Sequence, residues 1–209
     1  KLMGGEPFYQ KQALDLLEYL DERELLPNLR LTIPTNCTIF PNDTWMKYLD
    51  KVKTLVLCTS IDAVGELNTY IRHGSDWDTV DYNFKKYIEY AKKNQGRVYI
   101  STNTVVTIYN ANRIIDLTRY FYNHSIRPNW NCYDITSYPL YLNIGILTPE
   151  MKRILRPRCI TRIRSYLDNS TSNPELIETF KTMVTLLDDY HGLKFQDYNP
   201  KMYDIIFKY

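Results

Sequence analysis

Apolar residues along the chain alternate between a helical spacing and short, nearly continuous runs. A first helical stripe falls within residues 9–22, and the clearest one falls within Asp78–Lys93, where lysines occupy the opposite face. Strands are predicted at the runs Leu29–Pro34, Lys53–Thr59 and Arg97–Ser101. This alternation indicates βα units around a parallel sheet, and the apolar run at Lys53–Thr59 predicts a strand that is buried on both faces.

Turn-forming residues mark where these elements end. Asp43 is the candidate cap of a short helix, and Gly96 is expected to stop the helix before it. Pro149 opens another helix, and Pro157 should end or kink it. The remaining predictions are a helix at Ala111–Asn123, a strand within Asn129–Ile135, an irregular stretch at Pro139–Leu147, a long helix after Pro174, and a tail, His191–Tyr209, that folds back.

The composition limits the function classes. With 209 residues and 44% hydrophobic content, the chain is large enough for one globular core. The 26 basic and 24 acidic residues leave a net charge of +2, which excludes a general attraction to nucleic acid or to an anionic membrane. No run approaches the roughly 18 apolar residues of a membrane span, and residues 1–6 show no signal-peptide pattern. We therefore expect no membrane partner and a cytoplasmic location.

Cysteine and histidine spacing does not indicate a metal site. The cysteines at positions 37, 58, 132 and 159 are separated by 21, 74 and 27 positions, which fits no metal knuckle, so they are interpreted as buried free thiols. The three histidines, at positions 73, 124 and 191, are far apart in the sequence, and no metal is assigned to them.

The segment Gly4-Gly5-Glu6-Pro7 precedes the first helical stripe and is the most informative motif. Two adjacent glycines let the main chain turn sharply and offer bare backbone groups to a ligand, because no Cβ stands in the way. Glu6 supplies an acceptor for a ligand amine, and Pro7 suits the first turn of a helix starting just behind it. A plain turn would use the same residues, so that alternative stays open.

Polar landmarks also follow the next two predicted strands. Thr35-Asn36 ends one of them, Ser60-Ile61-Asp62 ends the other, and Arg72 precedes Asp76-Trp77. In this order, after Gly4-Gly5-Glu6-Pro7, they resemble landmarks of the radical S-adenosylmethionine (SAM) superfamily. The sequence looks most similar to its phage-associated and environmental branch, which carries a twitch-type C-terminal segment. The resemblance runs from Leu2 to Glu150 and faintly to Pro200.

That resemblance implies an α/β fold, a partial (β/α)6 barrel that lacks its first strands. Residues 1–147 would form the barrel part, and residues 148–209 a helical C-terminal extension packed on it. Members of the superfamily bind SAM at a 4Fe-4S cluster and generate a 5'-deoxyadenosyl radical. The implied function is hydrogen-atom abstraction from an unidentified peptide, protein or small molecule, in the host cytoplasm if the chain is viral.

The resemblance also assigns residues to the SAM site. Gly4, Gly5 and Glu6 would hold the methionyl amine, with Pro7 opening the helix behind them. Ser60 and Asp62 would lie beside the ribose or the carboxylate, and Arg72 would pair with the carboxylate. Residues at or just past strand ends would wall the adenosine pocket: Asn36, Asn103 and Val105. Other readings stay open, namely helix caps for Ser60 and Asp62, a surface ion pair for Arg72 and a turn for Asn36.

The chain departs from the family pattern in one respect. The superfamily holds its cluster with a C-x3-C-x2-C loop after the first strand, several tens of residues before the position of Gly4, and the given sequence contains no such loop. The chain as given is therefore expected to be inactive alone, with cluster ligands outside it. Because the strand at Leu29–Pro34 would expose an unpaired edge, a further N-terminal segment or a partner chain is expected to supply the first strands.

Two other functions remain as alternatives. Lys152–Arg164 concentrates six basic residues within thirteen positions and could contact phosphates or an acidic peptide, although a solvated helix face has the same pattern. The second hypothesis is a degenerate, catalytically inactive barrel that serves as a binding or assembly module, with nucleic acid as one candidate ligand. An unrelated α/β phosphate-binding enzyme is the third.

Overall fold

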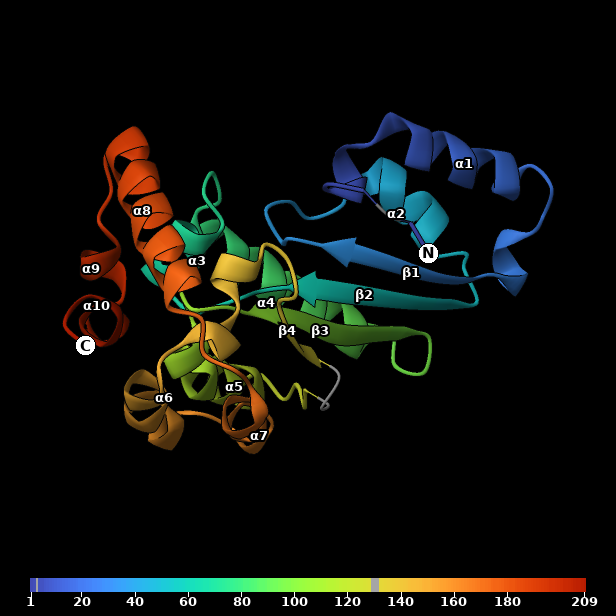
Figure 1. Cartoon of the computed structure of the whole chain (residues 1–209). Coiled ribbons are helices and arrows are strands. Elements are labelled where there is room, and N and C mark those ends of the chain that lie inside the picture. The colour runs from blue at the N-terminus through green and yellow to red at the C-terminus, as the bar shows by residue number, and fades with distance from the viewer. Residues whose placement is uncertain (3, 129–131) are drawn as a thin grey trace.

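Four parallel strands form the centre of the computed structural model, which describes residues 1–2, 4–128 and 132–209 (Figure 1). The strands are β1 (Arg30–Thr35), β2 (Thr54–Ser60), β3 (Val98–Val106) and β4 (Tyr133–Ile135). Their order in the sheet is β1-β2-β3-β4, so neighbours in sequence are neighbours in space. This confirms the predicted α/β fold with a parallel sheet. In the described part of the chain β1 and β4 are the two edges, and the sheet is open.

Helices connect and follow the strands. They are α1 (Lys11–Asp21), α2 (Asp43–Leu49), α3 (Glu66–Ile71), α4 (Trp77–Lys93), α5 (Ile114–Asn123), α6 (Pro149–Leu155), α7 (Thr161–Asn169), α8 (Pro174–His191), α9 (Phe195–Tyr198) and α10 (Pro200–Phe207). Short 3₁₀ turns lie between them: Pro7–Tyr9, Leu26–Asn28, Ala111–Arg113, Leu140–Leu142, Ile144–Ile146 and Arg156–Arg158. None of the helices in the described ranges is long and apolar enough to cross a membrane.

Some predicted boundaries differ from the structure. Asn42, and not Asp43, caps α2, because its Oδ1 accepts the hydrogen bond of the Trp45 N–H at 3.2 Å. Strand β3 continues five residues beyond the predicted Arg97–Ser101 segment. The buried positions of this extension are partly threonines, Thr102 and Thr104, which give no apolar signal in the sequence. The predicted strand within residues 129–135 is confirmed for 133–135, and residues 129–131 lie outside the described part.

One face of the sheet is buried against helices, and on the other face the residues of β2 are only partly buried. Alternate residues Leu55, Leu57 and Thr59 of β2 are buried against a core that includes side chains of α1, α2 and α4. The intervening residues, among them Val56 and Cys58, are only partly buried. The prediction that this strand is buried on both faces was therefore wrong. The same half-open face makes Cys58 an exception among the thiols predicted to be buried.

The free edge of β1 contacts the N-terminal residues through its backbone. The N–H of Leu2 donates a hydrogen bond to the carbonyl oxygen of Thr32 at 3.1 Å. Because β1 is an edge strand, such backbone groups are open to pairing with further polypeptide.

A second core joins the end of the sheet to the C-terminal helices. Val106, at the end of β3, shares this core with Phe180 of α8 and Met202 of α10, and all three side chains are fully buried. In Figure 1, α8, α9 and α10 stand beyond the carboxyl ends of the strands. The predicted return of the tail His191–Tyr209 onto the domain is confirmed by the burial of Phe195 in this core.

Asn199 connects this helical part to the loop after β3. Its side chain is 2% exposed and exchanges two hydrogen bonds with the Asn112 side chain, at 2.8 and 3.0 Å. It also donates to the carbonyl oxygen of Tyr109 at 2.8 Å and accepts from the N–H of Met202 at the start of α10. Asn173, at the start of α8, is a helix cap of the same kind but exposed.

We predict that Asn199→Ala lowers the free energy of unfolding by about 3 kcal/mol or more, because it leaves several buried polar groups without partners. Asn173→Ala, which removes only an exposed cap, should cost about 1 kcal/mol. Urea-induced unfolding of the two variants and the parent chain measures both values. Equal losses in the two variants would contradict the structural role given to Asn199.

Candidate functional site

A cavity of about 460 Å³ lies near the carboxyl ends of β1 and β2. We call it the Arg72 cavity, and its lining residues are Tyr9, Asn36, Thr38, Arg72, His73, Gly74 and Ser75. They come from the 3₁₀ turn before α1, from the loop after β1 and from the turn between α3 and α4. Loops at the carboxyl ends of parallel strands are where α/β folds place their ligands.

Glu6 fastens the N-terminal turn to the end of β1. Its Oε2 accepts hydrogen bonds from the Thr35 hydroxyl at 3.0 Å and from the Asn36 N–H at 2.8 Å, and its Oε1 accepts from the Phe8 N–H at 3.4 Å. Burial raises the pKa of the Glu6 carboxyl, although these hydrogen bonds act in the opposite direction. Glu6 is therefore largely occupied within the chain and does not line the Arg72 cavity.

The glycines beside Glu6 have different surroundings. Gly4 adopts a φ of +127°, a conformation that side-chain-bearing residues rarely take. Gly5 has open space where a Cβ would be, so its backbone is accessible. Pro7 begins a 3₁₀ turn, whereas α1 begins only at Lys11. The predicted start of the helix directly behind Pro7 is corrected accordingly, because the Glu6 contacts to β1 hold the chain in a separate turn first.

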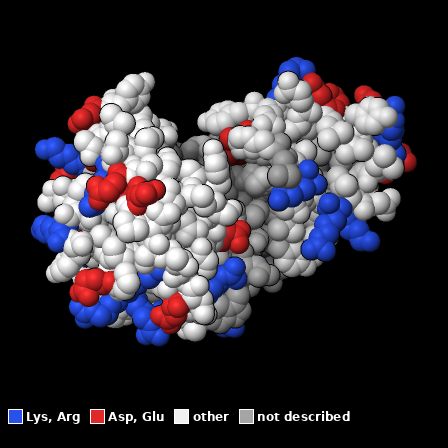
Figure 2. All heavy atoms as spheres, viewed as in Figure 1, with Lys and Arg blue, Asp and Glu red and all other residues white. Residues whose placement is uncertain are grey.

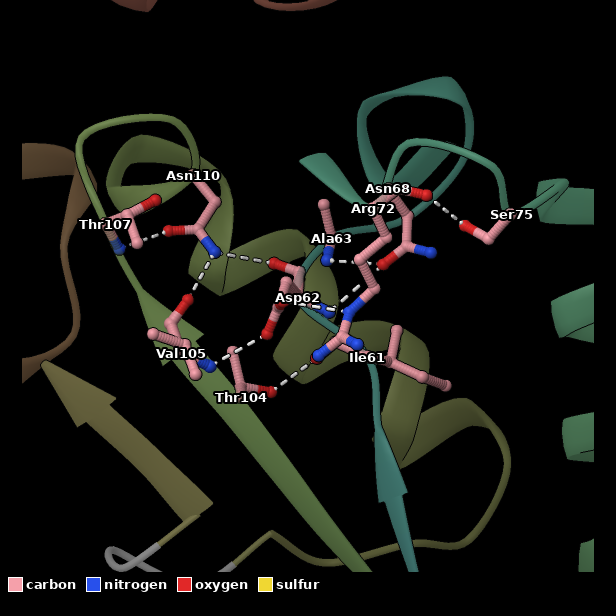
Figure 3. A network of polar contacts seen from close by, with 10 residues as sticks. All are labelled: Ile61, Asp62, Ala63, Asn68, Arg72, Ser75, Thr104, Val105, Thr107 and Asn110. Atoms are coloured by element: carbon pink, nitrogen blue, oxygen red, sulfur yellow. Dashed lines mark hydrogen bonds and ion pairs between the residues drawn. The ribbon is translucent and has the colours of Figure 1, made fainter. Parts of the chain in front are cut away.

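Asp62 lies at the centre of a polar network at the ends of β2 and β3 (Figure 3). Its Oδ1 accepts the hydrogen bond of the Val105 N–H at 2.8 Å, and its Oδ2 lies 2.9 Å from Nε of Arg72. Its side chain is only 8% exposed. Both carboxylate oxygens of Asp62 thus have partners within the chain.

Two buried asparagines hold the backbone around Asp62. The Asn110 side chain donates to the carbonyl oxygens of Asp62 and Val105, and its Oδ1 accepts from the Thr107 N–H. Oδ1 of Asn68 accepts from the Asp62 N–H at 3.1 Å. The sequence analysis did not single out either asparagine, because an Asn in a loop usually marks only a turn.

Arg72 faces both Asp62 and the cavity. Its side chain is 25% exposed, and its Nε is close enough to Asp62 for an ion pair, but the N–H is not directed at the carboxylate as a hydrogen bond requires. None of its guanidinium nitrogens donates a hydrogen bond to a residue in the described ranges. A largely buried guanidinium with unused donors in a polar cavity is suited to bind an anion.

The other predicted site residues lie on the half-open face of the sheet or beside it. Ser60, the last residue of β2, is directly paired in register with Asn103. Asn103 and Val105 lie within β3, not at or past its end as predicted, because β3 is longer than its apolar signal. Asn36 lines the Arg72 cavity, but its Oδ1 accepts both the N–H and the hydroxyl of Thr38, as in a turn.

The structure therefore brings only some of the predicted site residues together. Asn36 and Arg72 line one cavity, and Asp62 contacts Arg72 from behind. The remaining predicted residues are not among its lining: Gly4, Gly5, Glu6, Pro7, Ser60, Asn103 and Val105. Three further lining residues were not predicted from the sequence: Tyr9, Thr38 and Ser75. The one indication of them in the sequence is that each follows a predicted landmark within a few residues.

Two histidines that are distant in sequence meet beside the cavity. The rings of His73 and His191 have centroids 3.7 Å apart. His73 also lines a second cavity of about 180 Å³, together with Tyr70 and Asp188. Across residues 1–2, 4–128 and 132–209, no three side chains of the His, Cys, Asp or Glu type converge as metal ligands.

The cysteines of the described chain do not fit an iron-sulfur cluster. Burial raises the thiol pKa of Cys37 and Cys58, and it raises that of Cys159 to about 12. Cluster ligands are thiolates that converge on the iron atoms, and no three cysteine, histidine or acidic side chains of the described ranges converge in this way.

The basic segment Lys152–Arg164 forms parts of α6 and α7 with a turn between them. Arg156 pairs with Asp168 at 2.9 Å, and Arg153 pairs with Glu150. Lys152 and Arg164 donate to backbone carbonyl oxygens. Figure 2 shows basic and acidic side chains interspersed over this part of the surface, so it presents no field of one sign.

Comparisons with known proteins show a likeness of fold. No protein-family model and no curated protein matches the chain. Among solved structures, native anSMEcpe with bound AdoMet (S-adenosylmethionine) is similar over 92% of this chain and 47% of its own, at a TM-score of 0.51 and 17% identity. The same protein with bound AdoMet and Cp18Cys peptide gives 0.50 and 18%, with the same coverage.

Streptococcus suis SuiB bound to S-adenosylmethionine is similar over 81% of this chain and 37% of its own, with a TM-score of 0.48 and 20% identity. The chain spans less than half the length of each of these structures. At such identities the likeness to anSMEcpe concerns the fold alone, and the likeness to SuiB is too weak to carry an argument.

We predict that Glu6→Gln removes part of the pH dependence of stability. Because the pKa of Glu6 is raised, the folded chain holds the proton more tightly than the unfolded chain, so this group's contribution to stability is lost as the pH rises through the raised pKa. Glutamine cannot ionise. Urea-induced unfolding from about pH 4 to about pH 8 should show a smaller loss of stability in Glu6→Gln than in the parent.

The exposed residue Glu22 provides the matched control. Glu22→Gln should reproduce the pH profile of the parent chain, because an exposed carboxyl has similar surroundings in the folded and unfolded states. If the Glu6 and Glu22 variants gave the same profile, the burial of the Glu6 carboxylate would not be the cause.

Proposed function

We propose that the chain is the AdoMet-binding part of a radical SAM enzyme, with the Arg72 cavity receiving the methionyl carboxylate. The observation that carries this proposal is Arg72, a largely buried guanidinium whose donors are unused by the described residues. Its place near the carboxyl ends of parallel strands agrees with the general position of ligand sites in α/β folds. The fold likeness to anSMEcpe, an AdoMet-bound protein, supports the same proposal.

In this proposal the chain's residues bind and orient AdoMet. The Arg72 guanidinium pairs with the carboxylate, a contact for which its planar fork is well shaped. The backbone at Gly5 is open to the methionyl amine, and Ser60 with Asn103 offers polar groups to the adenosine on the half-open sheet face. If other polypeptide supplied a reduced 4Fe-4S cluster, one electron from it would cleave the C5'–S bond of AdoMet to give methionine and a 5'-deoxyadenosyl radical. That radical would abstract a hydrogen atom from a peptide, protein or small-molecule substrate.

The cluster itself would be held elsewhere. Because no set of described side chains converges as metal ligands, the thiolates would come from polypeptide beyond the residues described, or from a partner chain. The free edge of β1 provides the backbone groups to which the additional strands could pair.

A catalytically inactive binding module is the second candidate, and the lack of convergent metal ligands in the described ranges favours it. Formation of 5'-deoxyadenosine separates the two. Under anaerobic reduction, AdoMet should be cleaved when the chain is combined with the polypeptide that carries the cluster. Binding of AdoMet without any cleavage in that combination would favour the inactive module.

We predict that the chain binds AdoMet and that Arg72→Ala weakens binding about tenfold to a hundredfold, because a charge-assisted pair to the carboxylate is lost. Isothermal titration calorimetry measures both affinities. Arg119→Ala is the matched control, since Arg119 is an exposed arginine of α5 that pairs with Asp116 away from the cavity. An unchanged affinity in Arg72→Ala would contradict the site, and no binding by the parent chain would contradict the function.

A further inference from the structure

We propose that Asp62 is a positioning residue for Arg72 and not a contact of the ligand, so that the pair forms a preset receptor for a carboxylate. This inference rests on the proposed function for the identity of the ligand. It differs from the role that the family resemblance gives Asp62, which places this carboxylate beside the ribose or carboxylate of SAM.

The hydrogen bonds of Asp62 leave little room for a ligand. One carboxylate oxygen accepts from the Val105 N–H, and the other faces Arg72 at 2.9 Å. The carbonyl oxygen of Asp62 accepts from Asn110, and the Asp62 N–H donates to Asn68. With 8% of its side chain exposed and no place in the cavity lining, Asp62 supports the site from behind.

Charge balance explains why the two residues belong together. A buried carboxylate without a cation beside it is costly, and Arg72 supplies that cation. The ion pair occupies the Nε side of the guanidinium, which leaves the two terminal NH₂ groups for another partner. Because the pair is neutral as a whole, a ligand carboxylate is attracted by directed N–H groups more than by net charge. The direction of the guanidinium therefore decides the affinity.

The main chain of Arg72 is fixed independently of its side chain. Its N–H donates to the carbonyl oxygen of Asn68 at 2.8 Å, and its own carbonyl oxygen accepts from the Ser75 hydroxyl at 2.8 Å (Figure 3). Among the described residues the guanidinium donates no hydrogen bond, so the ion pair with Asp62 is the contact that we expect to hold it in place. Asn110 acts on Arg72 indirectly. Its side chain donates to the backbone carbonyl oxygens of Asp62 and Val105 and so holds Asp62 in place.

A double-mutant cycle measured by calorimetry tests the inference. Asp62→Asn keeps an oxygen acceptor for the Val105 N–H and replaces the charged oxygen that faces Arg72 with an uncharged NH₂ group. We expect it to weaken AdoMet binding about fivefold to twentyfold, and to add no further loss in the Arg72→Ala background. Losses that add in the double variant would overturn the inference, because Asp62 would then act on the ligand directly.

Decarboxylated AdoMet, which lacks the methionyl carboxylate, provides the matched ligand. Its affinity should be the same for the parent chain and for Asp62→Asn, since the group that Arg72 receives is missing. Asp62→Glu, which retains the charge, should restore part of the affinity for AdoMet. An equal loss for both ligands in Asp62→Asn would overturn the inference and indicate a contact with the adenosine part or a general loss of structure.

A measurement on the parent chain avoids dependence on folding of the variants. The Nε–H resonance of Arg72 in a nitrogen-15 spectrum should show restricted motion before any ligand is added. Free motion of this group in the ligand-free chain would overturn the positioning role. If the parent chain failed to bind AdoMet, the proposed function would fail, whereas a restricted Nε–H would still support the pairing of Asp62 with Arg72.

Discussion

The buried carboxylate of Asp62 is the interaction on which the arrangement of the site depends. It accepts from the backbone of β3 and faces an arginine that follows α3, so that one charged group joins the ends of two strands to the turn before α4. Burying a carboxylate is costly unless a cation and hydrogen-bond donors surround it. The cation beside Asp62 is the guanidinium of Arg72. The residue that stabilises the network therefore also lines the neighbouring cavity.

The sheet divides the molecule into a structural face and a half-open face. Helices α1, α2 and α4 bury alternate residues of β1 and β2, while the intervening residues, such as Val56 and Ser60, remain partly exposed. The C-terminal helices close the carboxyl end of the sheet through a second core and through the buried side chain of Asn199. The candidate site lies beside both parts, because its lining comes from loops near the strand ends and one lining residue, His73, contacts His191 of α8.

Periodicity predicted most elements because each has a local cause. Helix α4 follows an amphipathic stripe behind the capping residue Asp76, and Pro149 begins α6 at the residue expected. The errors have physical causes as well. Threonines take the place of apolar residues in the second half of β3, so its end was predicted too early. The strand at 53–59 was predicted to be buried on both faces because both sets of its alternating residues include apolar side chains. The order of the landmarks pointed to the ends of β1 and β2, where Asn36 and Arg72 do line one cavity.

The sequence by itself determined the parallel α/β class and the positions of most helices and strands, since these follow from local spacing and caps. Arg72 was singled out by the resemblance of the polar landmarks to those of a known superfamily. Only the tertiary structure decided which polar groups are occupied. It showed that Glu6 and Asp62 are held within the chain, that Asn110 supports Asp62, and that His73 meets His191. Such partners come from distant segments, and nothing in a local pattern fixes how those segments pack.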